Sequence, residues 1–279
     1  MTDSADDLLA LALDVAAEAA ALAVRMRAEG MSVAHTKSSP TDVVTAADRA
    51  VEELIRTRLL TARPDDAFLG EEGDDDAGTS GVRWVVDPID GTVNYLYGSH
   101  QYAVSIAAEL NGRIVAGVVH RPPTGTVYAV ALGGGSTCDG VPLRVRDVVP
   151  LEERLVHTGF SYVREVRARQ AGYIAALLPR VRDIRRPGSC SLDLCAVAAG
   201  EADGYVEEGA HLWDHAAAGL IVAEAGGTLE VTRAPGGKRL LICAPDEGFA
   251  EFRDVVVDSG FVHGEGPNRA QSARVLDGE

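Results

Sequence analysis

The chain opens with two stretches in which apolar residues recur at helical spacing. The first is rich in Ala and Leu, keeps its charges to one side and stops before Gly30, which predicts a long helix over residues 5–27. The second begins with a T-x-x-D sequence that ends at Asp48 and runs as far as the turn at Pro64, so we expect a helix over residues 45–61. Two helices therefore precede the first strand.

The pattern then changes to short apolar runs that are typical of strands. An Asn111-Gly112 pair separates two of these runs, and this dipeptide favours a tight hairpin turn. We therefore expect an antiparallel sheet, with strands over residues 67–69, 83–86, 102–110, 113–121 and 126–132.

Beyond Pro150 the pattern alternates between strands and helices, as in an α/β unit. This change predicts an N-terminal α+β subdomain over residues 1–148 and a C-terminal α/β subdomain over residues 149–264. Residues 265–279 lack apolar periodicity and are expected to form a disordered tail. The strands of the second unit are expected at residues 155–158, 181–185, 204–207, 228–231 and 240–243, and its helices at residues 163–178, 191–199, 214–225 and 247–257.

Composition places the chain among ordinary globular proteins, while its charge limits the partners that it can bind. Of 279 residues, 46% are hydrophobic and 24% are charged, so collagen, long coiled coil and wholesale disorder have no compositional support. The formal net charge of −16 repels polyanions, and we expect no direct partner among nucleic acids or membranes. A small anionic substrate would need a local reversal of this charge.

The cysteines and the first residues indicate a reducing location. Cys138, Cys190, Cys195 and Cys243 show neither CxxC nor Cys/His spacing, so we expect buried free thiols rather than a zinc or redox site. The N-terminus is acidic where a signal peptide is basic, and acids interrupt the apolar run that follows. The predicted location is cytoplasmic, with no membrane span.

The most informative stretch is WVVDPIDGTVNY, in which a hydrophobic strand ends on Asp87 and Asp90 follows three residues later. The proline between them fixes the turn, so both carboxylates can aim at one point beside the carbonyl of Ile89, a donor set suited to a hard cation. Gly91 permits close approach of a ligand, and a helix that starts at Thr92 favours a phosphate. The alternative is a turn with surface aspartates, which a lone D-x-x-D motif would favour.

Three further acids lie in comparable positions. Glu71 belongs to a Gly-Glu-Glu-Gly turn after a strand, Asp48 lies in the first turn of a helix, and Asp214 precedes a helical run. Taken singly, these acids are explained by a solvated loop, by the helix dipole and by a helix cap.

Together, these pieces resemble the inositol monophosphatase family, the lithium-sensitive, magnesium-dependent phosphatases. The similarity runs in the family's order from TDVVTAAD through GEE and WVVDPIDGTVNY to WDHAAAGLIVAEAGG. The stretch RDIRRPGSCSLDLCAVAAGEADGYVEEG looks most like the bacterial inositol-1-phosphatase branch. The resemblance implies an α/β (α+β) fold, a layered αβαβα sandwich of the inositol monophosphatase/fructose-1,6-bisphosphatase type, with an antiparallel-rich N-terminal sheet and a smaller C-terminal α/β half.

The resemblance also implies a role for each site residue. Thr92 and Asp48 would pair and, with Glu71, orient and deprotonate an attacking water, while the amides of Gly91 and Thr92 stabilise the phosphate oxygens. Two or three Mg²⁺ ions would be held by Glu71, Asp87, Asp90, Asp214 and the carbonyl of Ile89. The substrate would be bound by Asp90, Gly91, Thr92, Gly188, Ser189, Cys190, Glu207 and Asp214.

The implied function is Mg²⁺-dependent hydrolysis of myo-inositol monophosphate, a small phosphorylated polyol, by a homodimer. Histidinol phosphate, fructose 1,6-bisphosphate and a 3′-phosphoadenosine nucleotide are alternative substrates, and the acid pair Glu207-Glu208 would suit the cationic alcohol of histidinol. A non-catalytic protein that docks on a macromolecular partner is the alternative from another class.

The chain has Cys190-Ser191 where many relatives carry two alanines, a departure that bears on substrate choice. Four arginines, interpreted as solvated or as part of a dimer face, are Arg180, Arg182, Arg185 and Arg186.

Overall fold

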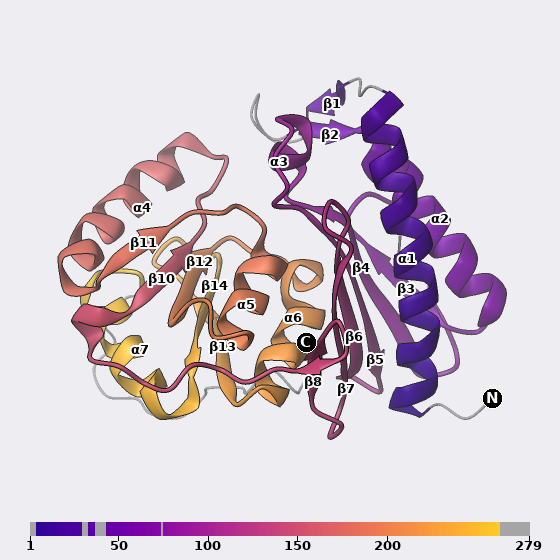
Figure 1. Cartoon of the computed structure of the whole chain (residues 1–279). Coiled ribbons are helices and arrows are strands. Elements are labelled where there is room, and N and C mark those ends of the chain that lie inside the picture. The colour runs from indigo at the N-terminus through magenta and orange to yellow at the C-terminus, as the bar shows by residue number, and fades with distance from the viewer. Residues whose placement is uncertain (1–3, 30–32, 37–42, 74, 263–279) are drawn as a thin grey trace.

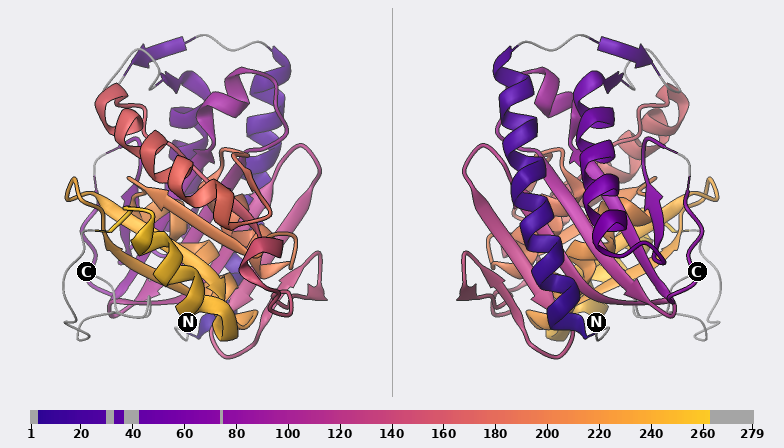
Figure 2. Two further views of the ribbon diagram at one scale, coloured as in Figure 1. Left: turned by 90° about the vertical axis from the view of Figure 1, so that its left-hand side faces the viewer. Right: turned by 90° about the vertical axis from the view of Figure 1, so that its right-hand side faces the viewer.

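Five layers of helices and sheets make up the molecule (Figure 1). The computed structural model describes residues 4–29, 33–36, 43–73 and 75–262, so the tail predicted for residues 265–279 lies outside the described residues. Helices α1 and α2 cover one face of a first sheet, α5 and α6 lie between the two sheets, and α4 and α7 cover the outer face of the second (Figures 1 and 2). The predicted αβαβα sandwich is therefore confirmed.

The outer N-terminal layer consists of α1 (Ala5–Glu29) and α2 (Ala46–Ala62), which lie side by side across the first sheet (Figure 2). Helix α1 turns a row of small residues inward, and Ala12, Ala16 and Ala19 are completely buried. Small side chains allow a helix to approach its neighbours closely, and α1 contacts α2, β5 and β6. Short strands β1 (Val33–Thr36) and β2 (Val43–Thr45), which the pattern did not predict, pair antiparallel ahead of α2.

The first sheet has seven strands in the order β3-β4-β5-β6-β7-β8-β9. All neighbours in it are antiparallel except β3 and β4, which run parallel, so the prediction of an antiparallel sheet was wrong for that pair. Parallel strands need a crossover connection, which here is the segment between Gly70 and Val82 that contains Glu71. Strands β8 and β9 were missed because they are too short to show a period. The bounds are β3 (Ala67–Gly70), β4 (Val82–Asp90), β5 (Ala103–Leu110), β6 (Arg113–Arg121), β7 (Thr126–Ala131), β8 (Ser136–Cys138) and β9 (Val141–Pro142).

The second sheet has five strands in the order β11-β10-β12-β14-β13. Strands β11, β10 and β12 are parallel to one another. Strand β14 is antiparallel to both of its neighbours, β12 and β13. The last strand of the first sheet ends at Pro142, and the first strand of the second sheet begins at Leu155. The domain boundary at 148/149 lies between them and stays a prediction. The bounds are β10 (Leu155–Thr158), β11 (Asp183–Arg185), β12 (Gly204–Glu208), β13 (Gly227–Arg233) and β14 (Arg239–Pro245).

The helices of the second half fall into two layers. Every residue of α5 (Cys190–Ala198) is buried, as expected for a mostly apolar helix packed between sheets, and its polar residues Ser191 and Asp193 are hydrogen-bonded to Asp90 and His157. With α6 (Leu212–Glu224) it contributes to the core that joins the two halves, while α4 (Arg164–Leu177) and α7 (Phe249–Asp258) lie on the outer face. Within the described ranges, none of the helices combines the length and apolar character needed to cross a bilayer.

Candidate active site

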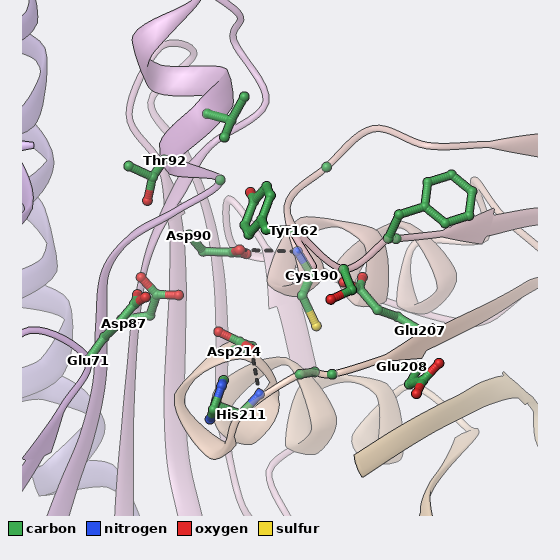
Figure 3. A pocket seen from close by; sticks show the side chains of 18 of the residues that line it. Glu71, Asp87, Asp90, Thr92, Tyr162, Cys190, Glu207, Glu208, His211 and Asp214 are labelled. Carbon is green, nitrogen blue, oxygen red and sulfur yellow. Dashed lines mark hydrogen bonds between the residues drawn. The ribbon is translucent and has the colours of Figure 1, made fainter. Parts of the chain in front are cut away.

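A cavity of about 390 Å³ lies where the two halves of the fold meet (Figure 3). One wall comes from the end of β4 and from α3 (Thr92–Leu96), and the other from the start of α5, the end of β12 and the start of α6. Acidic side chains from both walls face it. Most of the residues singled out from the sequence line it, namely Glu71, Asp87, Ile89, Asp90, Gly91, Thr92, Gly188, Cys190, Glu207 and Asp214.

The end of β4 brings Asp87 and Asp90 to the same edge of the sheet. The pairing of β4 with β5 shifts register between these two residues, because the D-P-I-D segment departs from regular strand geometry. Within it, the amide of Ile89 donates to Oδ1 of Asp87 at 3.1 Å. Both aspartates are buried, with 1% and 7% of their surface exposed, so surface aspartates in a solvated turn are excluded.

Asp90 is held by the N-terminus of α5 on the opposite wall. The hydroxyls of Ser189 and Ser191 donate to Oδ2 at 2.6 and 2.5 Å, and the amide of Ser191 donates to the same atom at 2.7 Å. The amide of Cys190 donates to Oδ1 at 3.2 Å. Burial raises the pKa of Asp90, and these four donors act in the opposite direction.

Asp214 lies in the first turn of α6, two residues beyond the helix start. The helix begins at Leu212, and the carboxylate of Asp214 accepts the amide of His211 at 2.6 Å in a capping box. Asp214 therefore supports the helix start, although the helix cap itself is His211. Its side chain also faces Glu71 and Asp87 across the cavity (Figure 3).

The acids of the site act strongly on one another. Burial raises the pKa of Asp87 well above its usual value, and Glu71, Asp90, Asp214 and Asp48 raise it further because their charges have the same sign. Burial and the neighbouring Glu71 likewise raise the pKa of Asp214 well above its usual value. So many close carboxylates are costly to ionise together unless positive charge lies among them.

The composition of this donor set suits Mg²⁺. It offers only carboxylate and carbonyl oxygens, which hard cations prefer, and needs neither thiolate nor imidazole. As the side chains stand in the described part of the chain, no three His, Cys, Asp or Glu residues converge closely enough to coordinate an ion. Instead, the carboxylates of Asp90 and Asp214 accept hydrogen bonds within the protein. The residues fit a magnesium site in the chemistry of their donor atoms and in their shared location, and these side chains would have to move to bind the ion.

Thr92 and Asp48, expected to form a hydrogen-bonded pair, lie at different depths. The Thr92 hydroxyl, on the cavity wall, donates to the carbonyl of Ile89 at 3.2 Å, while Asp48 is buried in the first turn of α2 and makes interactions of its own. A hydroxyl carries one proton, so a bond from Thr92 to Asp48 would need rotation about its side chain. The pair stays a prediction.

On the far side of the cavity, Glu207 accepts the phenol of Tyr205 at 2.5 Å. Burial raises the pKa of Glu207 to about 7, while the Tyr205 phenol and the Arg186 guanidinium oppose the rise and Asp193 adds to it. Burial also raises the pKa of Cys190 well above its usual value. A thiol that ionises so reluctantly is a poor nucleophile, so Cys190 shapes the wall.

Two features of the site were not found from the sequence. The Asn94 side-chain amide donates to the carbonyls of Gln101, Pro187 and Gly188 at 2.7 to 3.2 Å, which ties the helix after Asp90 to the loop before α5. Its place in the T-V-N-Y motif was the available signal, but its partners lie up to 94 residues away. In addition, Arg186 and Lys238 bring positive charge to the cavity wall.

Two expectations for neighbouring charges can be compared with the structure. Arg186, interpreted as solvated or as part of a dimer face, is exposed and also lines the cavity beside Tyr162 and Glu207. Glu208 was considered with Glu207 as a pair for a cationic alcohol, and both line the cavity. Oε2 of Glu208 accepts the side chain of Gln170 at 3.2 Å, and its Oε1 lies 3.8 Å from the guanidinium of Arg169. The pairing with Glu207 stays a prediction.

Comparison with known proteins identifies the family. The model of the family described as the inositol monophosphatase family matches residues 4–257. The chain belongs to the inositol monophosphatase family. Its members are phosphoric monoester hydrolases and are generally Mg²⁺-dependent.

Individual members of the inositol monophosphatase family match over most of their length. The chain is 44% identical over 263 residues to inositol-1-monophosphatase SuhB of Mycobacterium tuberculosis, covering 88% of this chain and 91% of the relative. A solved structure of Mycobacterium tuberculosis SuhB superposes with a TM-score of 0.81, 38% identity and coverage of 94% and 100%. Extragenic suppressor protein suhB of Bartonella henselae superposes with a TM-score of 0.81, 34% identity and coverage of 90% and 98%.

Proposed function

We propose that the chain is a Mg²⁺-dependent phosphomonoesterase that hydrolyses myo-inositol monophosphate to inositol and phosphate. The observation that carries the proposal is the meeting of Glu71, Asp87, Asp90 and Asp214 in one cavity, where burial and mutual repulsion raise the pKa of Asp87 and Asp214. Such a group of buried carboxylates suits the binding of several metal cations. The relatives named as inositol-1-monophosphatases support the choice of substrate.

The acids divide into two proposed tasks. Glu71, Asp87, Asp90, Asp214 and the carbonyl of Ile89 would hold the cations, which we take to number two or three. When bound, Mg²⁺ supplies positive charge that offsets the carboxylates, polarises the phosphate ester and makes water easier to deprotonate.

The remaining residues would bind substrate and move protons. Glu71, with Thr92 and Asp48, takes the proton from the attacking water, and the amides of Gly91 and Thr92 hydrogen-bond the phosphate oxygens. Gly91 has φ +94°, and a Cβ there would lie 2.8 Å from the carbonyl oxygen of Gln101, so only glycine brings the backbone this close. Glu207 accepts a hydroxyl of the inositol ring, and Gly188 and Cys190 line the wall beside it. Ser189, expected to bind substrate with them, is buried behind this wall, where its hydroxyl donates to Asp90.

The proposal is tested with inositol 1-phosphate. Purified protein with Mg²⁺ should release phosphate, and Asp90→Asn should abolish release because the substitution alters a ligand and removes a charge. A suitable control is Asp147→Asn, which changes an acid whose side chain is 84% exposed and paired with Arg144. Full activity of the Asp90 variant would exclude this assignment of the site.

A polyol bisphosphate such as fructose 1,6-bisphosphate is the second candidate substrate. Arg186 and Lys238 favour it because both cations line the cavity and could bind a second phosphate on the alcohol. The engagement of Glu208 by Arg169 and Gln170 gives histidinol phosphate no comparable support. The ratio of kcat/KM over these esters and a 3′-phosphoadenosine nucleotide decides among them. We further propose that the chain forms a homodimer, has a cytoplasmic location and divides into two subdomains at 148/149.

A further inference from the structure

One buried acid of helix α2 contacts the turn that carries Glu71 without reaching the cavity. Glu52 is only 3% exposed, and its Oε2 accepts the amide of Glu72 at 2.8 Å. The amide of Gly73 favours the charged form of the same carboxylate. One side chain therefore binds the backbone directly after Glu71.

The turn is also shaped to fit around this side chain. A Cβ on Gly70 would lie 2.4 Å from Oε2 of Glu52, and a Cβ on Gly73 would lie 2.8 Å from its Oε1. Glycine on either side of the Glu-Glu pair is therefore explained by the space that the Glu52 carboxylate fills. In the sequence alone, these glycines indicated only a loop.

The surroundings of Glu52 hold its carboxylate in place. Arg56, one helical turn further along α2, has its guanidinium 3.8 Å from Oε1. The same guanidinium pairs with Asp76 and lies 4.4 Å from the ring centre of Phe68 in β3. Burial raises the pKa of Glu52, while the two amides and Arg56 lower it. The Glu52 carboxylate is therefore a buried hydrogen-bond acceptor whose contacts lie within the protein.

We propose that Glu52 is the positioning residue for Glu71, holding the peptide between Glu71 and Glu72 so that the Glu71 carboxylate stays in the cavity. The amide of Glu72 belongs to the peptide that sets the ψ angle of Glu71, so a bond to that amide restrains the backbone from which the Glu71 side chain leaves. Asp48 lies one turn earlier on the same helix and is also buried. A single helix would thus carry Asp48, expected to act with Thr92, and orient Glu71. The inference rests on the proposed role of Glu71 in Mg²⁺ binding.

The test compares Mg²⁺ binding of three variants on helix α2, by isothermal titration with MgCl₂ alone and by kcat/KM for inositol 1-phosphate. Glu52→Ala removes the acceptor, and we expect Mg²⁺ affinity to fall by about 10- to 100-fold, as is usual when a group that orients a metal ligand is lost. Glu52→Gln keeps one acceptor oxygen and should stay within about threefold of wild type, since this oxygen can still accept the amide of Glu72. Glu53→Ala is the matched control, because Glu53 is the exposed neighbour on the same helix.

The outcomes separate this inference from the proposed function. Wild-type affinity in Glu52→Ala overturns the inference, as does a loss that Glu53→Ala shares. If the protein binds Mg²⁺ but does not hydrolyse inositol 1-phosphate, the substrate proposal fails while the binding data still decide the role of Glu52.

A measurement on the unmodified protein covers the case in which Glu52→Ala does not fold. Hydrogen exchange should show protection of the Glu72 amide, since it donates to a buried carboxylate. Exchange of this amide at the rate of an open loop would overturn the inference without any variant.

Discussion

The hydroxyl of Ser191 donates a 2.5 Å hydrogen bond to Oδ2 of Asp90, across a separation of 101 residues in the chain. Ser189 donates to the same oxygen from the N-cap of α5. The hydroxyl of Ser191 is therefore a second side-chain donor on a proposed Mg²⁺ ligand. The departure noted at Cys190-Ser191 acts on the metal side of the cavity as well as on the alcohol side.

Ser191→Ala should lower the free energy of unfolding by about 1–2 kcal/mol in urea without Mg²⁺, because one hydrogen bond to a buried carboxylate is lost while three remain. Ser189→Ala should cost about 1 kcal/mol more, since Ser189 also accepts the amide of Leu192 as the helix cap. Equal losses for the two variants would contradict the separate capping role.

Asp87→Asn should make the metal-free protein more stable while it inactivates the enzyme. The substitution removes an acid whose pKa burial and the like charges of Glu71, Asp90, Asp214 and Asp48 raise, and we expect a gain of about 1 kcal/mol in urea. Phosphate release should fall by at least about 100-fold, and the rise in Tm that Mg²⁺ gives the wild type should be largely lost.

The pH dependence of metal-free stability has a definite sign. Because the pKa of Asp87 and of Asp214 is raised in the folded state, that state binds more protons than the unfolded chain between the usual value near 3.8 and the raised one. Stability should therefore fall as pH rises through this window. Urea unfolding of the metal-free protein at several pH values measures the slope, which should be smaller in Asp87→Asn.

Substrate binding should depend on pH through Glu207. Its pKa is raised to about 7, and only the carboxylate can accept a substrate hydroxyl without competing as a donor. KM for inositol 1-phosphate should therefore fall as pH rises through about 7, and Glu207→Gln should abolish this dependence.

Tyr205→Phe should move that midpoint upward by about 0.5–1 pH unit, because the phenol that favours the charged form of Glu207 is lost. A midpoint that stays at wild-type pH would show that another group titrates.

Gly91→Ala tests how closely the backbone must approach at the phosphate end of the site. Residue 91 has φ +94°, and an added Cβ would meet a backbone carbonyl at 2.8 Å. Gly125→Ala is the matched control, because Gly125 also has positive φ, +71°, with nothing within 4 Å of the added Cβ. Gly125→Ala should cost about 1 kcal/mol from backbone strain alone, and Gly91→Ala about 3 kcal/mol together with most of the activity.

The sequence was sufficient to predict the elements with a clear period and the acids that follow them. Helices 5–27 and 45–61 and the hairpin at Asn111-Gly112 correspond to observed elements within two residues, since amphipathic spacing and turn chemistry are local. The parallel pairing of β3 with β4 was not predictable, because strand direction depends on where the crossover packs. Likewise, Arg186 looked solvated in a run of arginines, and only the closure of the two halves places it in the cavity.

The partners of the site residues were even less visible in the sequence. The donors on Asp90 lie about 100 residues away, and the glycines around Glu71 acquire their meaning only from Glu52 on another element. No local pattern encodes such pairs. The sequence therefore indicated candidate residues, most of which the structure brings to one cavity, whereas the partners of their side chains are seen only in the structure.

The bonds between Asp90 and the start of α5 also affect the order in which the molecule can be assembled. Contacts between residues so distant in the chain close large loops and form slowly. During refolding, the helices and the hairpins should regain their circular dichroism signal before Asp90 finds its four donors. Recovery of phosphatase activity would then lag behind secondary structure, making catalysis a kinetic marker for the docking of the two halves.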